Sequence, residues 1–146
     1  MKISDEWWTS PTDSENGKLI MVTGRRGVEP AIETGKYTDR IDITWKYEAD
    51  ETGMPDKATS ILMEQVTDSL QKTFRKEKAA IMTGIYTGDG ERNYVFYSRN
   101  NSVFNKLLNQ ALAEFELLPL SIYAEKDPEW EEYHEMKDIS FIEDGE

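Results

Sequence analysis

The most regular pattern along the chain is an alternation of apolar and polar residues over positions 40–48. Successive side chains of a strand point to opposite faces of a sheet, so this alternation predicts a strand with one buried face and one hydrated face. A short β-branched run at 18–23, between two glycines, predicts an earlier strand. The alternating residues are Ile41, Ile43, Trp45 and Tyr47 on the apolar side, and Asp42, Thr44, Lys46 and Glu48 on the polar side.

Two longer stretches carry apolar residues at helical spacing. The first follows Pro55 and Asp56 and predicts an amphipathic helix that runs to about Lys76. The second begins where Asn101 or Ser102 can cap a helix, and its broad apolar face is expected to pack against a sheet. The apolar positions are Leu62, Met63, Val66, Leu70 and Phe74 in the first helix, and Val103, Phe104, Leu107, Leu108, Ala111, Leu112 and Phe115 in the second.

Glycine and proline residues mark the boundaries of three further predicted strands. Gly-Asp-Gly at 88–90 separates β-rich runs at 79–87 and 91–99, and it predicts a hairpin because glycine adopts the positive φ angles of a tight turn. Pro119 precedes a last predicted strand at 120–125. In that strand we expect three residues to point inward: Leu120, Ile122 and Ala124.

The pair Asp127 and Pro128 predicts the start of a terminal helix that runs to about Lys137. The predicted order is therefore β-β-α-β-β-α-β-α. Without the first strand and the last helix, this is the split βαβ arrangement of an α+β, ferredoxin-like sandwich, in which an antiparallel sheet carries two helices on one face. We expect a single domain over residues 1–146, with an aromatic N-terminal segment at 1–16 and an acidic tail at 138–146.

The composition excludes several classes of chemistry. The chain has no cysteine, which removes disulfides, thiolate zinc sites, iron–sulfur clusters and cysteine nucleophiles. It has no apolar run long enough for a signal peptide core or a membrane span, so we expect a cytoplasmic protein without a membrane partner. The net charge of −12 repels phosphate backbones and makes nucleic acid an unfavourable partner.

Most of this negative charge lies near the C-terminus. Residues 125–146 contain ten carboxylates and only two basic residues, Lys126 and Lys137. A cluster of this kind is typical of a solvated face or tail, and the alternative is a docking surface for a basic partner. The ten acids are Glu125, Asp127, Glu129, Glu131, Glu132, Glu135, Asp138, Glu143, Asp144 and Glu146.

Three segments together resemble a known family: the hairpin over 82–97, Asp-Pro-Glu-Trp-Glu-Glu-Tyr at 127–133, and Glu-Trp-Trp at 6–8. They are similar to the uncharacterised bacterial domain-of-unknown-function family 695, and the resemblance covers nearly the whole chain. It implies no established activity and no catalytic residues. The family is similar, more distantly, to the type B regulators of ribonuclease E activity, acidic ferredoxin-like inhibitors that bind proteins.

No pattern in the sequence predicts a catalytic or metal centre. His134 follows Glu131 by three residues, but a carboxylate-bridged metal site needs a second such pair, so we predict no metal and no cofactor. Arg25 and Arg26 follow a strand in a glycine-rich turn that lacks the phosphate-loop lysine. They are candidate anion-binding residues, and the alternative is a turn with solvated arginines.

Aromatic and acidic residues at the two ends supply the other candidate binding positions. Trp7 and Trp8 are adjacent, so in an extended segment they point to opposite sides and only one can enter a given core. Trp130 and Tyr133 are expected to attach the terminal helix to the sheet, with a binding role as the alternative. The candidate binding residues on the terminal segment are Glu129, Trp130, Glu131 and Tyr133.

These features favour a non-enzymatic protein-interaction or regulatory domain over an enzyme. The docking surface would be an uncovered sheet face or the acidic terminal helix, and the partner would be another protein. The chain itself is expected to be a monomer or a weak dimer. The alternative is a small-molecule-binding domain or a weak carboxylate-based hydrolase, with a pocket between the N-terminal segment and the sheet.

Overall fold

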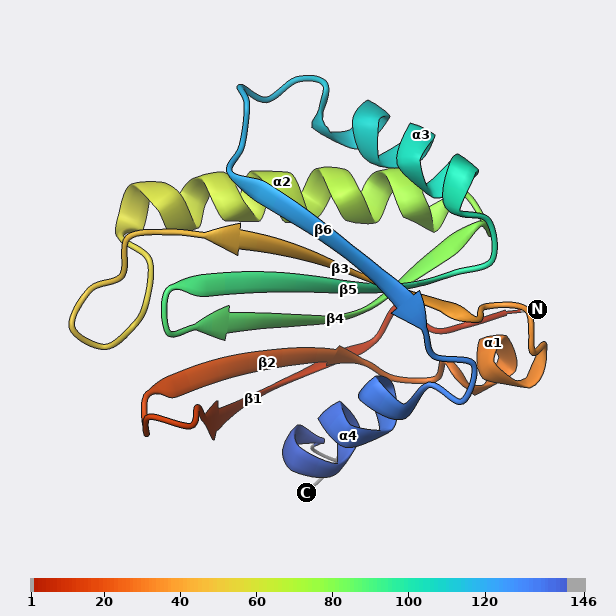
Figure 1. The fold of residues 1–146 in the computed structure, drawn as a ribbon, viewed down its shortest axis with the longest axis horizontal. Helices are drawn as coiled ribbons and strands as arrows, with labels where there is room; N and C mark the ends of the chain where they lie inside the picture. Colours follow the sequence, from red (N-terminus) through yellow and green to blue (C-terminus); the bar gives the residue numbers. More distant parts are fainter. Residues whose placement is uncertain (1, 142–146) are drawn as a thin grey trace.

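The computed structural model describes residues 2–141. Within them the chain forms four helices and a six-stranded antiparallel sheet, with strand order β1-β2-β4-β5-β3-β6 (Figure 1). The strands are β1 (Trp7–Asp13), β2 (Leu19–Arg25), β3 (Asp39–Lys46), β4 (Ala80–Gly88), β5 (Glu91–Ser98) and β6 (Leu120–Lys126). The helices are α1 (Glu29–Glu33), α2 (Lys57–Arg75), α3 (Asn101–Leu112) and α4 (Glu131–Ser140).

The elements predicted from strong periodicity are confirmed. The alternation at 40–48 forms β3, the two runs around the Gly-Asp-Gly turn form the hairpin of β4 and β5, and the two amphipathic stretches form α2 and α3. Asp56 caps α2 by accepting a hydrogen bond from the Thr59 backbone N–H at 2.8 Å. Asn100, one residue earlier than expected, caps α3 by accepting from the Val103 N–H at 3.1 Å.

The first core lies between the sheet and the helices α2 and α3. β3 contributes its apolar side and β5 contributes Tyr94 and Phe96. Phe74 of α2 and Phe104 of α3 meet Phe96 with ring centroids 4.7 and 5.1 Å apart, which joins both helices to the sheet. This face of the central strands is therefore closed by apolar packing.

The second core lies on the opposite face of the sheet, because adjacent strand residues such as Tyr94 and Val95 belong to different cores. α4 covers this face by packing against β1, β2 and β4, and α1 adds the buried Ala31 (Figure 1). α2 and α3 share one face as expected, but the expectation that the helices leave the other face uncovered is corrected. α4 approaches closely because Gly84 has no side chain: a Cβ there would lie 2.6 Å from Met136 Sδ.

Several local expectations also need correction. Residues 7–13, predicted as part of an aromatic segment, form β1, and the loop before β3 contains α1. α4 begins at Glu131 rather than at Pro128, and its N-cap Trp130 has a left-handed backbone with φ 56°. Ile122 points to the expected side of β6 but is 53% exposed, because β6 is the outer strand and α3 does not cover it.

The predicted acidic tail at 138–146 is divided by the end of α4. Asp138 lies in α4, which ends at Ser140, and residues 142–146 lie outside the described residues. Within residues 2–141, no helix combines the length and the apolar character that a membrane crossing requires.

Candidate functional site

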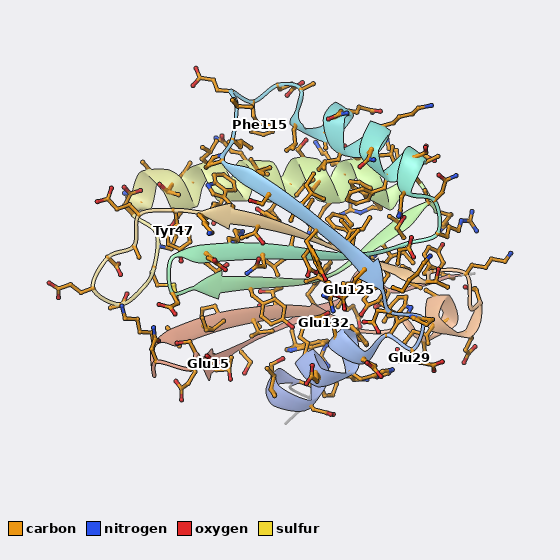
Figure 2. The ribbon with its side chains drawn as sticks, viewed as in Figure 1. Glu15, Glu29, Tyr47, Phe115, Glu125 and Glu132 are labelled. Atoms are coloured by element: carbon orange, nitrogen blue, oxygen red, sulfur yellow. The ribbon has the colours of Figure 1, made fainter. Side chains whose placement is uncertain are left out.

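A cluster of ionisable side chains lies on the second face of the sheet, beside α4. Its members are Arg40 and Asp42 of β3, Tyr86 of β4, Glu125 of β6 and Glu132 of α4, and we call it the Arg40 cluster. The sheet register sets the spacing, since Arg40 pairs with Glu125 across the β3–β6 ladder. Figure 2 shows the labelled Glu125 and Glu132 where β6 ends and α4 begins.

Arg40 is the centre of the cluster. Its guanidinium Nη2 lies 3.2 Å from Asp42 Oδ2 and 3.7 Å from Glu125 Oε2. The Arg40 side chain is only 17% exposed. Burial alone would lower the pKa of Arg40, but the charges of Asp42, Glu125 and Glu132 raise it, so the guanidinium stays positive. One cation thus offsets three carboxyl groups.

Glu132 is the carboxyl group most affected by its surroundings. Burial raises its pKa to about 7, a hydrogen bond from the Tyr86 hydroxyl opposes the rise, and the charge of Asp42 adds to it. Burial also raises the pKa of Asp42, against the opposing charge of Arg40. Two neighbouring acids are therefore both held in sites that disfavour their charged forms.

The cluster contains buried polar atoms that lack hydrogen-bond partners. Within residues 2–141, three side-chain atoms are fully buried without a partner: Arg40 Nε, Asp42 Oδ1 and Glu132 Oε2. All three belong to the cluster. An unsatisfied buried polar group costs about 1–3 kcal/mol, so a concentration of them marks a place where water or a bound group would be stabilised.

The segment before α4 determines where Glu132 lies. Asp127 accepts hydrogen bonds from the backbone N–H groups of Glu131 at 2.9 Å and Glu132 at 3.2 Å, and from the Tyr97 hydroxyl at 2.6 Å. Burial would raise the pKa of Asp127, but these hydrogen bonds lower it overall. Trp130 stacks on Tyr97 with ring centroids 4.0 Å apart. These contacts attach the first turn of α4 to β5.

The cluster carries an excess of acidic groups, with one arginine among three carboxyl groups. Asp42 and Glu132 each present a buried acceptor oxygen, and Arg40 Nε presents one donor. A cationic group suits the two oxygens, because it stabilises the ionised carboxylates that burial disfavours. Among residues 2–141, no group of three or more histidine and acidic side chains has the geometry to hold a metal ion.

Two of the residues expected to bind a ligand, Trp7 and Arg25, line a cavity of about 210 Å³ between the N-terminal segment and α2. Arg25 donates to the backbone oxygens of Ser4 at 2.8 Å and Met82 at 3.2 Å, and its guanidinium lies 5.4 Å from the Trp7 ring centroid. Its contacts hold the N-terminal segment on the sheet. The cavity is smaller than the roughly 300–1,000 Å³ of typical ligand pockets.

The other expected residues lie in different places. Trp8 is buried under α4, where its indole N–H donates to Ser140 Oγ at 3.0 Å. Trp7 points to the opposite side, as predicted, and packs partly buried against the first core. The Arg26 guanidinium lies 5.0 Å from the Phe141 ring centroid. The structure does not bring Arg26 or Trp8 to the Arg40 cluster.

The terminal segment divides into buried and exposed residues. Trp130 and Tyr133 are each 1% exposed, and their polar groups donate to the backbone oxygens of Tyr37 at 2.9 Å and Arg25 at 2.6 Å. Their rings are therefore part of the core. Glu129 and Glu131 are exposed on the same segment.

Sequence reasoning did not identify the Arg40 cluster as a site. Asp42 was interpreted as one of the hydrated residues of β3, and Glu132 as one of many C-terminal acids. One signal was available: Glu132 lies within the segment 127–133, whose aromatic residues indicated attachment to the sheet. The partner strand could not be predicted, because Glu132 and Asp42 meet only through tertiary packing.

A family model described as "Family of unknown function (DUF695)" matches residues 6–136. No curated protein and no solved structure matches the chain. The matched range includes β1 through most of α4, and so every residue of the Arg40 cluster.

Proposed function

The chain belongs to the DUF695 family of unknown function, and from its own site we propose that it is a protein-interaction domain whose Arg40 cluster receives a cationic side chain of a partner protein. The observation that carries this proposal is the excess of carboxylate oxygens over cations in the cluster: Arg40 alone offsets Asp42, Glu125 and Glu132, and Glu125 is 44% exposed. Such oxygens are acceptors for a lysine or arginine of another chain.

The location of the cluster supports a macromolecular partner over a small molecule. Glu125 is 44% exposed and neighbouring Tyr123 is 56% exposed, so one side of the cluster opens to the surface. The exposed Glu129 and Glu131 extend the negative surface next to it. A net charge of −12 steers positively charged partners toward the molecule and increases their association rate.

The ionisation of Glu132 makes the expected affinity depend on pH. Burial disfavours ionised Glu132, and a bound cation reverses this, so affinity should increase as pH rises through about 7.

Affinity capture from a lysate of the native organism tests the proposal. The bait is the whole chain, in wild-type form and as the variant Asp42→Asn, Glu125→Gln, Glu132→Gln. A matched control carries Glu48→Gln, Glu51→Gln and Glu64→Gln, which remove the same charge from exposed positions outside the cluster. Quantitative mass spectrometry compares the captured proteins.

We expect a discrete partner that the wild type and the control both retain and that the cluster variant loses. Its retention should decrease as salt concentration increases, because the contact is between charges. Equal capture by the cluster variant, or the absence of any reproducible partner, would contradict the proposal.

A second candidate function is a small-molecule site that uses carboxylate acid–base chemistry. The observation that favours it is Glu132, whose pKa of about 7 is suited to proton transfer near neutral pH. Tyr86 also lines an open cavity of about 450 Å³ with Asn93 and Ile139. A metabolite library screened by thermal shift tests this candidate: a ligand whose stabilisation is lost in Glu132→Gln would favour it over a protein partner.

We also infer that the segment from β3 to β6 is a ferredoxin-like unit to which β1, β2, α1 and α4 are additions. The order of its strands, β4-β5-β3-β6, supports this inference because it is the order that a split βαβ unit produces.

The predicted distant similarity to type B regulators of ribonuclease E activity remains an expectation. It agrees with a protein-binding role only by analogy of fold and charge.

A further inference from the structure

We propose that β6 accepts an extended segment of the partner protein as an additional strand of the sheet, and that this segment carries apolar and cationic residues in alternation. The proposal rests on the proposed function, since its cationic residues are those that meet the Arg40 cluster. It adds the backbone geometry and the sequence pattern of the partner.

β6 is an open edge of the sheet. Among residues 2–141 it pairs only with β3, and it lies at the outside of the sheet (Figure 1). The register with β3 is continuous from Leu120 to Lys126, without a bulge. Residues 121–126 are all exposed. The other edge strand, β1, contains Pro11, which has no N–H to donate. β6 has no proline within it, so its outer backbone groups are available to another strand.

One side of β6 adjoins an apolar surface. Ile122 pairs with Ile43 of β3 and so lies on the same side as the first core, yet it is 53% exposed. Next to it, Leu117 is fully exposed. Ile122 and Leu117 line a cavity of about 430 Å³ with Leu112, Phe115 and other residues of the α3–β6 segment, where Figure 2 labels Phe115. An added strand would place apolar side chains over this surface.

The other side of β6 adjoins the Arg40 cluster. Tyr123 pairs with Asp42, and Glu125 pairs with Arg40. Successive residues of a strand point to opposite faces of a sheet. In an added strand, every second residue would cover the apolar surface, and the residues between them would point toward the Arg40 cluster. Cationic residues fit there, since they would meet the exposed carboxylate of Glu125 at the edge of the cluster. The two faces of β6 therefore favour a partner segment in which apolar and cationic residues alternate.

A second copy of this chain fits the edge poorly. Each copy carries a net charge of −12, and pairing of two β6 strands would bring the carboxylates of both Arg40 clusters to the same interface. Like charges placed across an interface oppose association. Charge complementarity thus favours a cationic segment of a different protein.

Peptide binding to the whole isotope-labelled chain, followed by NMR, tests the inference. The probe is a short capped peptide of alternating lysine and valine. One control peptide has the same composition with its lysines and valines in two blocks, and the other is the alternating peptide methylated on its amide nitrogens. The protein variants are Ile122→Ser and the control Ile61→Ser, which changes a comparably exposed residue of α2.

The alternating peptide should bind about tenfold more tightly than either control peptide and should slow amide exchange at residues 121–125. Ile122→Ser should weaken it, and Ile61→Ser should not. Equal binding of the block peptide without exchange protection in β6 would overturn strand addition and leave a purely electrostatic docking site. If no peptide binds, strand addition is wrong, while lysate capture with the cluster variant still decides the proposed function independently.

Discussion

Burial of Glu132 links the stability of the protein to pH. Its pKa rises from 4.5 in the unfolded chain to about 7 in the folded protein. Between these values the folded state keeps a proton that the unfolded state has lost. The free energy of unfolding therefore falls as pH rises through this window, and the loss is complete above it.

The variant Glu132→Gln should remove this dependence, because glutamine cannot ionise and its carbonyl can still accept the Tyr86 hydroxyl. At about pH 8 we expect the variant to be more stable than the wild type by up to about 3 kcal/mol, the free energy equivalent of the pKa change. Near pH 4 the difference should vanish. Urea unfolding across this pH range measures both values.

Glu131 provides the control for this experiment, since it is the adjacent residue of α4 and is exposed. Glu131→Gln removes a charge from the same turn without affecting a buried group. Its stability profile should follow that of the wild type. A Glu132→Gln profile that also follows the wild type would show that burial does not perturb the ionisation of Glu132.

Two glycines allow large side chains to pack against the second face of the sheet. A Cβ on Gly24 would lie 2.1 Å from the Trp8 ring, and one on Gly84 would lie 2.6 Å from Met136 Sδ. The indole is rigid, whereas methionine can change rotamer. Gly24→Ala should therefore cost about 3 kcal/mol and Gly84→Ala about 1–2 kcal/mol by urea unfolding. The reverse order would contradict this packing.

At the level of elements, Asp127 attaches the first turn of α4 to the sheet. Asp127→Ala removes two acceptors for the backbone N–H groups of α4 and the acceptor of the Tyr97 hydroxyl. We expect a loss of about 2–3 kcal/mol and faster amide exchange across α4. Asp56→Ala, which removes only the cap of α2, should cost about 1 kcal/mol and leave exchange in α4 unchanged. Similar exchange profiles for both variants would contradict this attachment.

The sequence predicts correctly those elements in which the spacing of apolar residues matches a single buried face. The alternation in β3 and the apolar stripes of α2 and α3 each face one core, so the local pattern was sufficient. β1 could not be recognised, because Trp7 and Trp8 enter different cores and a proline, Pro11, lies within the strand. α1 has only five residues, too few for a helical period to be visible.

The position of α4 on the sheet could not be predicted from the local sequence pattern. Its aromatic residues correctly indicated attachment to the sheet, but which face it would cover depends on Gly24 and Gly84, whose missing side chains make room for Trp8 and Met136. The Arg40 cluster depends in turn on that placement. It joins residues of β3, β4, β6 and α4 that no spacing in the sequence connects.

In the whole molecule, the two faces of the sheet have different roles. α2 and α3 close the first face with apolar packing, while α4 packs on β1, β2 and β4 of the second, and Trp130 stacks on Tyr97 of β5. Three members of the Arg40 cluster lie beside this covered part, with Arg40 and Asp42 on β3 and Glu125 on the open edge strand β6. The molecule thus combines a large negative charge with an exposed edge strand, β6, beside the Arg40 cluster. The proposed docking function requires both features.

Site-specific photocrosslinking in the native cell tests that function most directly. A benzophenone amino acid replaces Tyr123, which is 56% exposed beside Asp42, or replaces Ile61 on α2, which is 47% exposed, as the control. The account predicts a discrete adduct at position 123, absent at position 61, whose crosslinked peptide from the partner carries lysine or arginine. No adduct at position 123, or the same adducts at both positions, would contradict it.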